Sequence, residues 1–147
     1  MAQVLSLPNA FFLAGDALFV GTDVSRPALE AARKNLLAAG VSLENTRLFE
    51  TDFRDALDLP IFANGADVIV TNPLMGRRVP VGKLGRLIGN LFSVVLSLLR
   101  DGGRFALVNP LKNYAVLPSL SLIRRNQVDM GGFDGWLELY TKPKRKS

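Results

Sequence analysis

Short apolar runs alternate along this chain with segments in which the apolar positions recur every three or four residues. The first run, 18–23, is apolar until it ends on the carboxylate of Asp23, and it predicts a short buried strand. A helix is expected next, because Ser25 is a suitable N-cap, Pro27 suits the first turn and Gly40 stands where the helix should end. The apolar face of this helix comprises Leu29, Ala32, Leu36 and Ala39.

The same alternation continues through the middle of the chain. Residues 46–50, 66–71 and 104–108 are typical of strands, and the segment 66–71 is apolar enough to be covered on both faces of a sheet. A second helix is expected before the last of these strands, and the Asp-Gly-Gly sequence at 101–103 should end it. The apolar stripe of this helix comprises Leu84, Leu87, Ile88, Leu91, Val95 and Leu98.

The last part of the chain has a different pattern. Two strand-like runs, 122–128 and 136–141, flank a Gly-rich turn and predict an antiparallel hairpin. Alternating strands and helices that end in such a hairpin predict one α/β domain with a Rossmann-like, mostly parallel sheet. We expect this domain to occupy residues 1–141 and residues 142–147 to form a basic tail.

Polar side chains follow three of the predicted parallel strands: Asp23, Asp52 and Asn72. In doubly wound sheets ligands bind beyond the carboxyl ends of the strands, so these side chains indicate a binding site. The Asp23 carboxylate suits the hydroxyls of a ribose, Asp52 can accept from the amine of an adenine, and Phe53 can flank the adenine ring. Either carboxylate alone is better explained as a helix-terminal or turn residue, whereas the two together favour a nucleoside site.

The sequence Asn72-Pro73 is a candidate catalytic element. A side-chain amide oxygen and a nearby backbone carbonyl can accept both hydrogens of an exocyclic amine, which turns the nitrogen lone pair toward an electrophile. Such a reaction needs no general base with a tuned pKa if a cofactor supplies the reactive methyl group. An ordinary Asn-Pro turn is the alternative explanation of the same two residues.

Composition narrows the possible chemistry. The chain has no Cys and no His, which excludes thiol nucleophiles, disulfides, a Cys/His zinc site and a histidine base. Residues 1–70 carry five basic and nine acidic side chains, a balance of −4, whereas residues 71–147 carry thirteen and four, a balance of +9. This asymmetry favours a nucleic-acid partner over a merely solubilising tail.

The longest apolar stretch, 84–99, is too short to span a bilayer, so we expect a soluble cytoplasmic protein without membrane contact.

Four stretches together resemble the methyltransferase domain of RNA guanosine-N2 methylases, a group that often carries an RNA-binding THUMP domain. They are GTDVSRPALEAARKNLLAAGV, TDFRD, ADVIVTNPLMGRR and DMGGFDGWLELYTK, and the resemblance covers roughly residues 15–141. It implies a seven-stranded class I methyltransferase fold, S-adenosylmethionine as the cofactor and an RNA base amine, guanine N2, as the substrate. By matching position, Asp23 would contact the ribose, Asp52 the adenine, and Asn72 with Pro73 the target amine.

The chain departs from the family pattern at two places. The stretch that corresponds to the Gly-rich loop after the first strand, 3–12, contains no glycine. That strand and loop are therefore degenerate, or they are missing and the chain begins in the helix that follows the loop. The family's Asn-Pro-Pro-aromatic motif continues here as Leu74-Met75, so the thioether of Met75 would contact the target base in place of an aromatic ring.

Several basic side chains are candidates for binding RNA. Arg77 and Arg78 follow the Asn-Pro motif directly, where a substrate phosphate could approach, and the basic tail could add contacts that do not depend on sequence. The tail residues in question are Lys142, Lys144, Arg145 and Lys146. The expected partner is tRNA or rRNA, and because no THUMP domain is present we also expect a protein partner or a homodimer to help recruit it.

Three hypotheses follow for the function. The first is an S-adenosylmethionine-dependent RNA methyltransferase acting on a base exocyclic amine. The second is a catalytically inactive methyltransferase-like module that binds RNA or a protein partner. The third is a Rossmann-like domain for another nucleotide, which the absence of phosphate-binding glycines makes weaker.

Overall fold

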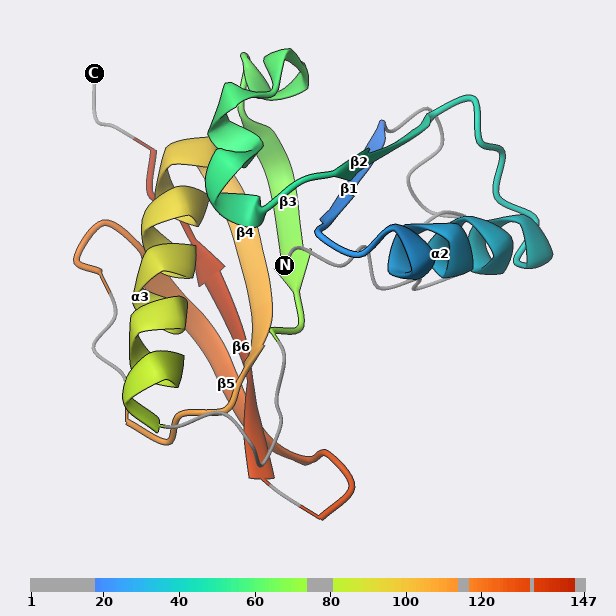
Figure 1. Ribbon diagram of the computed structural model, residues 1–147. Helices are drawn as coiled ribbons and strands as arrows, with labels where there is room; N and C mark the ends of the chain where they lie inside the picture. The colour runs from blue at the N-terminus through green and yellow to red at the C-terminus, as the bar shows by residue number, and fades with distance from the viewer. Residues whose placement is uncertain (1–17, 74–80, 114–116, 133, 145–147) are drawn as a thin grey trace.

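The computed structural model describes residues 18–73, 81–113, 117–132 and 134–144 (Figure 1). The predicted strands 46–50 and 66–71 are confirmed with those bounds, and the other predicted elements differ by a few residues at their ends. The elements in chain order are β1 (Phe19–Asp23), α2 (Arg26–Ala38), β2 (Thr46–Glu50), the 3-10 helices η1 (Phe53–Asp58) and η2 (Pro60–Phe62), β3 (Ala66–Thr71), α3 (Val81–Leu98), β4 (Leu99–Asn109), β5 (Ser121–Asp129) and β6 (Asp134–Thr141).

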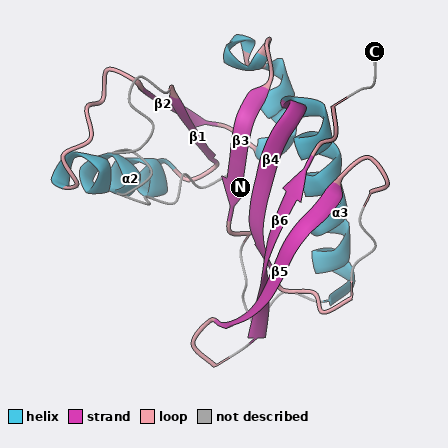
Figure 2. Cartoon of the chain, turned by 180° about the vertical axis from the view of Figure 1, so that it is seen from behind, coloured by secondary structure: helices cyan, strands magenta, loops and turns pink. Residues whose placement is uncertain are grey.

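The described strands form two sheets. Strands β1 and β2 pair in parallel, and a four-stranded sheet has the order β3-β4-β6-β5. In the larger sheet β3 and β4 are parallel, whereas β6 pairs antiparallel with both β4 and β5, as expected for a closing hairpin. Among the described residues no strand lies between β1 and β3, so six strands stand where the family resemblance implies seven (Figure 2).

Helix α2 begins and ends as its sequence predicts. Ser25 is the N-cap, and its side-chain oxygen accepts a hydrogen bond from the backbone nitrogen of Ala28 at 3.3 Å. Gly40 follows the last turn with φ of 75°, a conformation that glycine adopts at little cost. On the apolar face, Leu36 is fully buried.

Helix α3 covers one face of the four-stranded sheet and forms the main core with it (Figure 1). At its centre Phe92 of α3 meets the edges of two rings of the sheet, Phe105 at 5.4 Å and Tyr140 at 5.2 Å between centroids. Edge-to-face pairs of this kind add to the stabilisation from burial of apolar area. The amphipathic stripe of α3 therefore fixes the helix against β4 and β6.

The expectation that strand 66–71 is covered on both faces is wrong. The side chain of Ile69 packs against the core under α3, but Val68, on the opposite face of the sheet, is 61% exposed. Hydropathy alone could not reveal this difference, because the apolar run is continuous while only one face of β3 meets α3.

The Asp-Gly-Gly sequence has a different role from the predicted one. Helix α3 ends at Leu98, and residues 99–103 already belong to β4, whose pairing with β3 is irregular at this point. A side chain at Gly103 would place its Cβ 2.8 Å from the carbonyl oxygen of Arg100, so only glycine fits this bulge.

Among the described residues neither α2 nor α3 has the length and hydropathy that a transmembrane span requires.

Candidate functional site

The polar residues predicted to share one edge of the sheet lie at the ends of their strands. Asp23 is the last residue of β1, Asn72 directly follows β3, and Asp52 stands between β2 and η1 as the N-cap of η1. Strands β1 and β3 both run toward the same end of the molecule in Figure 1. The parallel arrangement thus brings strand ends that are distant in sequence to one side of the structure.

Asp23 combines a structural contact with an unused acceptor. The residue is 3% exposed, and its Oδ1 accepts a hydrogen bond from the backbone nitrogen of Ser25 at 2.8 Å. The other carboxylate oxygen, Oδ2, is buried and has no hydrogen-bond partner in the described part of the chain. A buried charged oxygen without a partner is energetically costly, so a ligand that donates to Oδ2 would remove that cost.

Asn72 shows the same feature at the end of β3. Its side-chain oxygen Oδ1 is buried and lacks a partner in the structure as described. The next residue, Pro73, is buried and lines a cleft. The amide oxygen therefore remains available to accept from an incoming donor.

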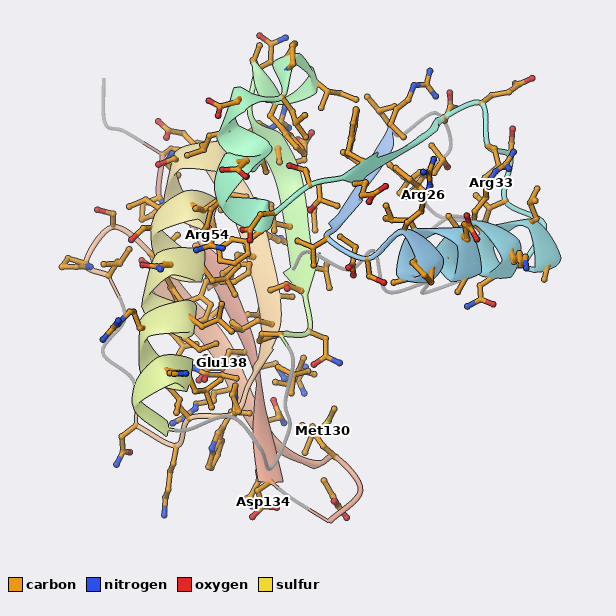
Figure 3. The ribbon with its side chains drawn as sticks, viewed as in Figure 1. Arg26, Arg33, Arg54, Met130, Asp134 and Glu138 are labelled. Atoms are coloured by element: carbon orange, nitrogen blue, oxygen red, sulfur yellow. The ribbon has the colours of Figure 1, made fainter. Side chains whose placement is uncertain are left out.

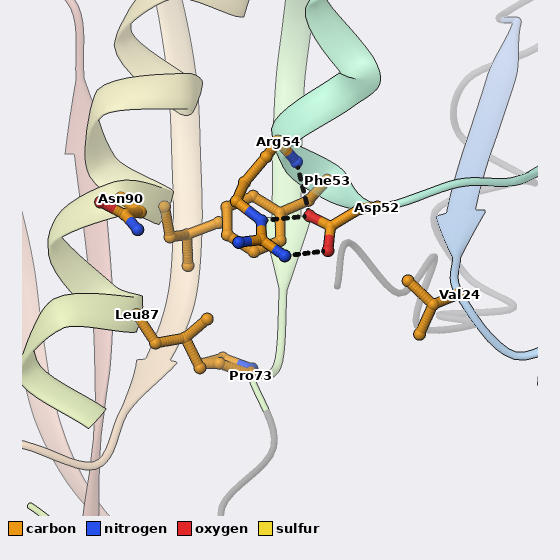
Figure 4. Close-up of a pocket in the computed structure, with 8 residues that line it drawn as sticks. Val24, Asp52, Phe53, Arg54, Pro73, Leu87 and Asn90 are labelled. Atoms are coloured by element: carbon orange, nitrogen blue, oxygen red, sulfur yellow. Dashed lines mark hydrogen bonds and ion pairs between the residues drawn. The ribbon is translucent and has the colours of Figure 1, made fainter. Parts of the chain in front are cut away.

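A cleft of about 220 Å³ lies between the two sheets and α3 (Figure 4). Its lining comprises Val24, Asp52, Phe53, Arg54, Pro73, Leu87, Asn90 and Leu91. Sites that enclose a complete small-molecule ligand usually have roughly 300–1,000 Å³, so this cleft suits one planar fragment of a ligand. Asp23 and Asn72 are not among the residues that line this cleft, but each directly precedes one that does, Val24 and Pro73 respectively.

Within this cleft Asp52 is held by Arg54 (Figure 4). The guanidinium donates from Nε to Oδ1 at 2.8 Å and from Nη2 to Oδ2 at 2.6 Å, and the Arg54 backbone nitrogen donates to Oδ1 at 2.9 Å. These hydrogen bonds from Arg54 lower the pKa of Asp52 from 3.8 to about 2, against the raising effect of burial. The side-chain hydrogen bond to Asp52 in turn raises the pKa of Arg54 above its ordinary value.

Phe53 connects the cleft to the core. Its ring is 6% exposed and packs with residues of α3, and the Arg54 guanidinium lies 6.0 Å from its centroid. The cleft therefore combines an aromatic and aliphatic lining with a single ionised carboxylate, as a site for a planar polar heterocycle requires.

The sequence did not identify every residue that lines the cleft. Val24 and Arg54 adjoin the predicted Asp23 and Asp52, so sequence adjacency was an available signal for these two. Leu87 was predicted only as a core position of α3, and nothing in the sequence pattern singled out Asn90. Their place in the cleft depends on how α3 packs beside η1, a tertiary feature without a local signal.

The predicted RNA-binding residues are only partly described. Met75, Arg77, Arg78, Arg145 and Lys146 lie outside the described residues. Lys142 stands beside the start of β4, at the end of the sheet opposite Asn72, and its ammonium donates to the carbonyl oxygens of Leu96 at 2.9 Å and Leu99 at 2.6 Å. Lys144 is exposed nearby. The structure thus does not bring these two lysines together with the cleft.

Solved structures of similar shape were found for most of the chain. TrmN from Thermus thermophilus has a TM-score of 0.72 and 28% identity, over 90% of this chain and 39% of that one. NSun6 from Pyrococcus horikoshii, solved with SFG, has a TM-score of 0.70 and 16% identity, over 92% of this chain and 44% of that one. An rRNA methylase from Streptococcus thermophilus has a TM-score of 0.61 and 14% identity, over 86% of this chain and 74% of that one.

These similarities concern the fold. Neither a protein-family model nor a curated protein sequence matches the chain. The chain spans less than half the length of TrmN and of NSun6. The fold nevertheless matches those neighbours over 86% to 92% of this chain, at TM-scores from 0.61 to 0.72. The chain therefore has a Rossmann-like, class I methyltransferase fold with a C-terminal antiparallel hairpin.

Proposed function

We propose that this domain binds S-adenosylmethionine and serves an RNA methyltransferase that acts on a base exocyclic amine, guanine N2. One observation carries the proposal. Two buried oxygens have no hydrogen-bond partner among the described residues, Oδ2 of Asp23 and Oδ1 of Asn72, and the residue that follows each of them lines the same cleft. One is an anion suited to hydroxyl donors and the other a neutral acceptor suited to an amine.

The residues present fit the adenosine part of this cofactor. The Asp23 Oδ2 atom would accept from ribose hydroxyls, and the side chains of Val24 and Phe53 would contact the adenine ring. Asp52 would accept from the adenine amine, since the ionised carboxylate is an acceptor only. The bound cofactor supplies an electrophilic methyl group, which the side chains of this chain cannot provide.

Asn72 and Pro73 would act on the second substrate. With its Oδ1 accepting one hydrogen of the target amine, Asn72 orients the nitrogen lone pair, and the fixed backbone at Pro73 limits the directions from which the amine can approach. The RNA assignment is supported by the excess of basic residues after position 70 and by the presence of an rRNA methylase among proteins of this fold.

A calorimetric titration of the chain with S-adenosylhomocysteine tests cofactor binding. We expect saturable one-to-one binding that Asp23→Asn weakens roughly 10- to 100-fold, because a hydrogen bond to a charged group is lost. The amide keeps an acceptor for the Ser25 nitrogen, so the thermal unfolding temperature should not fall. Asp58→Asn, an exposed carboxylate outside the cleft, is the matched control. A folded chain that shows no binding would refute the cofactor assignment.

Transfer of labelled methyl groups to unmodified tRNA and rRNA transcripts tests the role of Asn72. We expect Asn72→Ala to lower the transfer rate at least about 100-fold while cofactor affinity changes less than about threefold. Equal losses in rate and in cofactor affinity would instead assign Asn72 to the cofactor site.

A catalytically inactive module is the second candidate function. It is favoured by Leu74 and Met75, which stand where the resembling family has a second proline and an aromatic residue. This candidate predicts RNA or protein binding without methyl transfer, even for chains that bind the cofactor.

A further inference from the structure

The Asp52 carboxylate has almost all of its hydrogen-bonding capacity taken up by one neighbour. Arg54 supplies three donors to it, two from the guanidinium and one from the backbone (Figure 4). Two of these donors meet Oδ1 and one meets Oδ2. An ionised carboxylate offers about four acceptor positions, two on each oxygen. The contacts with Arg54 thus leave one acceptor position, on Oδ2, in a residue that lines the cleft.

The direction of that remaining acceptor is fixed. The guanidinium is a planar fork whose two parallel hydrogen bonds define the plane of the carboxylate, which an ammonium cannot do. The guanidinium carbon also lies 6.0 Å from the centroid of the buried Phe53 ring. Because Asp52 stays ionised far below neutral pH, Oδ2 can only accept.

We propose that Arg54 is a positioning residue that makes the cleft specific for an amino-purine over an oxo-purine. By using three acceptor positions of Asp52, it leaves one, on Oδ2, for the substituent of a base bound in the cleft. An amine at that place donates to Oδ2, whereas a carbonyl oxygen would face a carboxylate oxygen with no hydrogen between them. This inference rests on the proposed function, in which the cleft receives the base of the cofactor.

The test compares S-adenosylhomocysteine with its deaminated analogue, S-inosylhomocysteine, by calorimetry. We expect the chain to prefer the amino compound by at least about 50-fold, because a site with a fixed hydrogen-bond acceptor rejects an analogue that cannot donate to it. Arg54→Lys keeps the charge but loses the fork, and it should reduce this preference at least about tenfold. Arg33→Lys, an exposed residue of α2, is the matched control and should leave the preference unchanged.

A second variant gives the opposite readout. Asp52→Asn can keep its amide oxygen toward Arg54 and present its amine to the cleft, so the preference should shift toward the inosyl compound. Because the Asp52–Arg54 pair is partly exposed, both variants should unfold within about 2 °C of the parent chain.

A preference that is the same in Arg54→Lys as in the parent would overturn the inference while cofactor binding stands. A parent chain that binds neither compound would overturn the proposed function together with this inference.

Discussion

Arg54 and Asp52 illustrate how two neighbouring residues can set the charge state of a site. The pKa of Asp52 lies at about 2 because Arg54 donates hydrogen bonds to its ionised form. The lowered pKa means that the stabilisation from this pair is complete above about pH 4 and is lost as the pH falls through about 2. Acidification to pH 4 should therefore leave the carboxylate available to a donor.

Carboxyl-carbon NMR titration checks this directly. In the parent chain we expect the Asp52 signal to remain that of the ionised form at pH 3, and in Arg54→Met we expect its midpoint to return toward 3.8. A midpoint near 4 for Asp52 in the parent chain would contradict the hydrogen bonds between Asp52 and Arg54.

At the scale of elements, a buried carboxylate joins β4 to the closing hairpin. Glu138 of β6 is 3% exposed and accepts hydrogen bonds from Asn109 at 3.0 Å and from the Tyr140 hydroxyl at 2.7 Å. Its other oxygen pairs with Arg125 of β5 at 2.9 Å, and Arg125 also lies 4.0 Å from the ring centre of Trp136. In Figure 3 Glu138 is labelled below Arg54 in the view.

We expect Arg125→Met to lower the free energy of unfolding by about 3 kcal/mol, because it leaves a buried charge without its cationic partner. The double variant Arg125→Met/Glu138→Gln should recover at least about half of that loss, since the charge is then removed as well. Urea unfolding followed by the fluorescence of Trp136 measures both. Arg124→Met, an exposed neighbour, should change the value by less than about 0.5 kcal/mol. No recovery in the double variant would refute the ion-pair explanation.

For the whole molecule, the notable feature is the open face of the four-stranded sheet, which no helix covers among the residues that the structure describes. Val68 is 61% exposed and Leu137 46% exposed, and the strand register puts both on the face away from α3. Exposed apolar area of this kind favours association. Recruitment of RNA through a homodimer would use such a face.

We therefore expect light scattering to show self-association of the chain that increases with concentration. The double variant Val68→Thr/Leu137→Thr should lower the apparent mass toward that of a monomer, because both side chains lose apolar area at the open face. Leu57→Thr, another exposed apolar position but outside this sheet, is the control. A parent chain that stays monomeric across the concentration range would contradict the prediction.

The sequence by itself determined the two α-helices, the six strands and their order, but not the 3-10 helices η1 and η2. Ser25 and Pro27 locate the start of α2, the apolar run before Asp23 gives β1, and the Gly-rich turn separates β5 from β6, because caps, periodicity and turn chemistry are local properties. The sequence also predicted Asp23 and Asn72 as polar residues after buried strands. Their role in binding stays a prediction.

Only the tertiary structure decided which residues share the cleft and which sheet face is open. Leu87 and Asn90 line the cleft because α3 packs beside η1, and the fork between Arg54 and Asp52 depends on side-chain conformations that no spacing encodes. Ile69 packs against the core and Val68 is exposed, because only one face of β3 meets α3. Local patterns specify where an element begins and which way its residues alternate, whereas contacts between distant segments depend on how the elements pack in three dimensions.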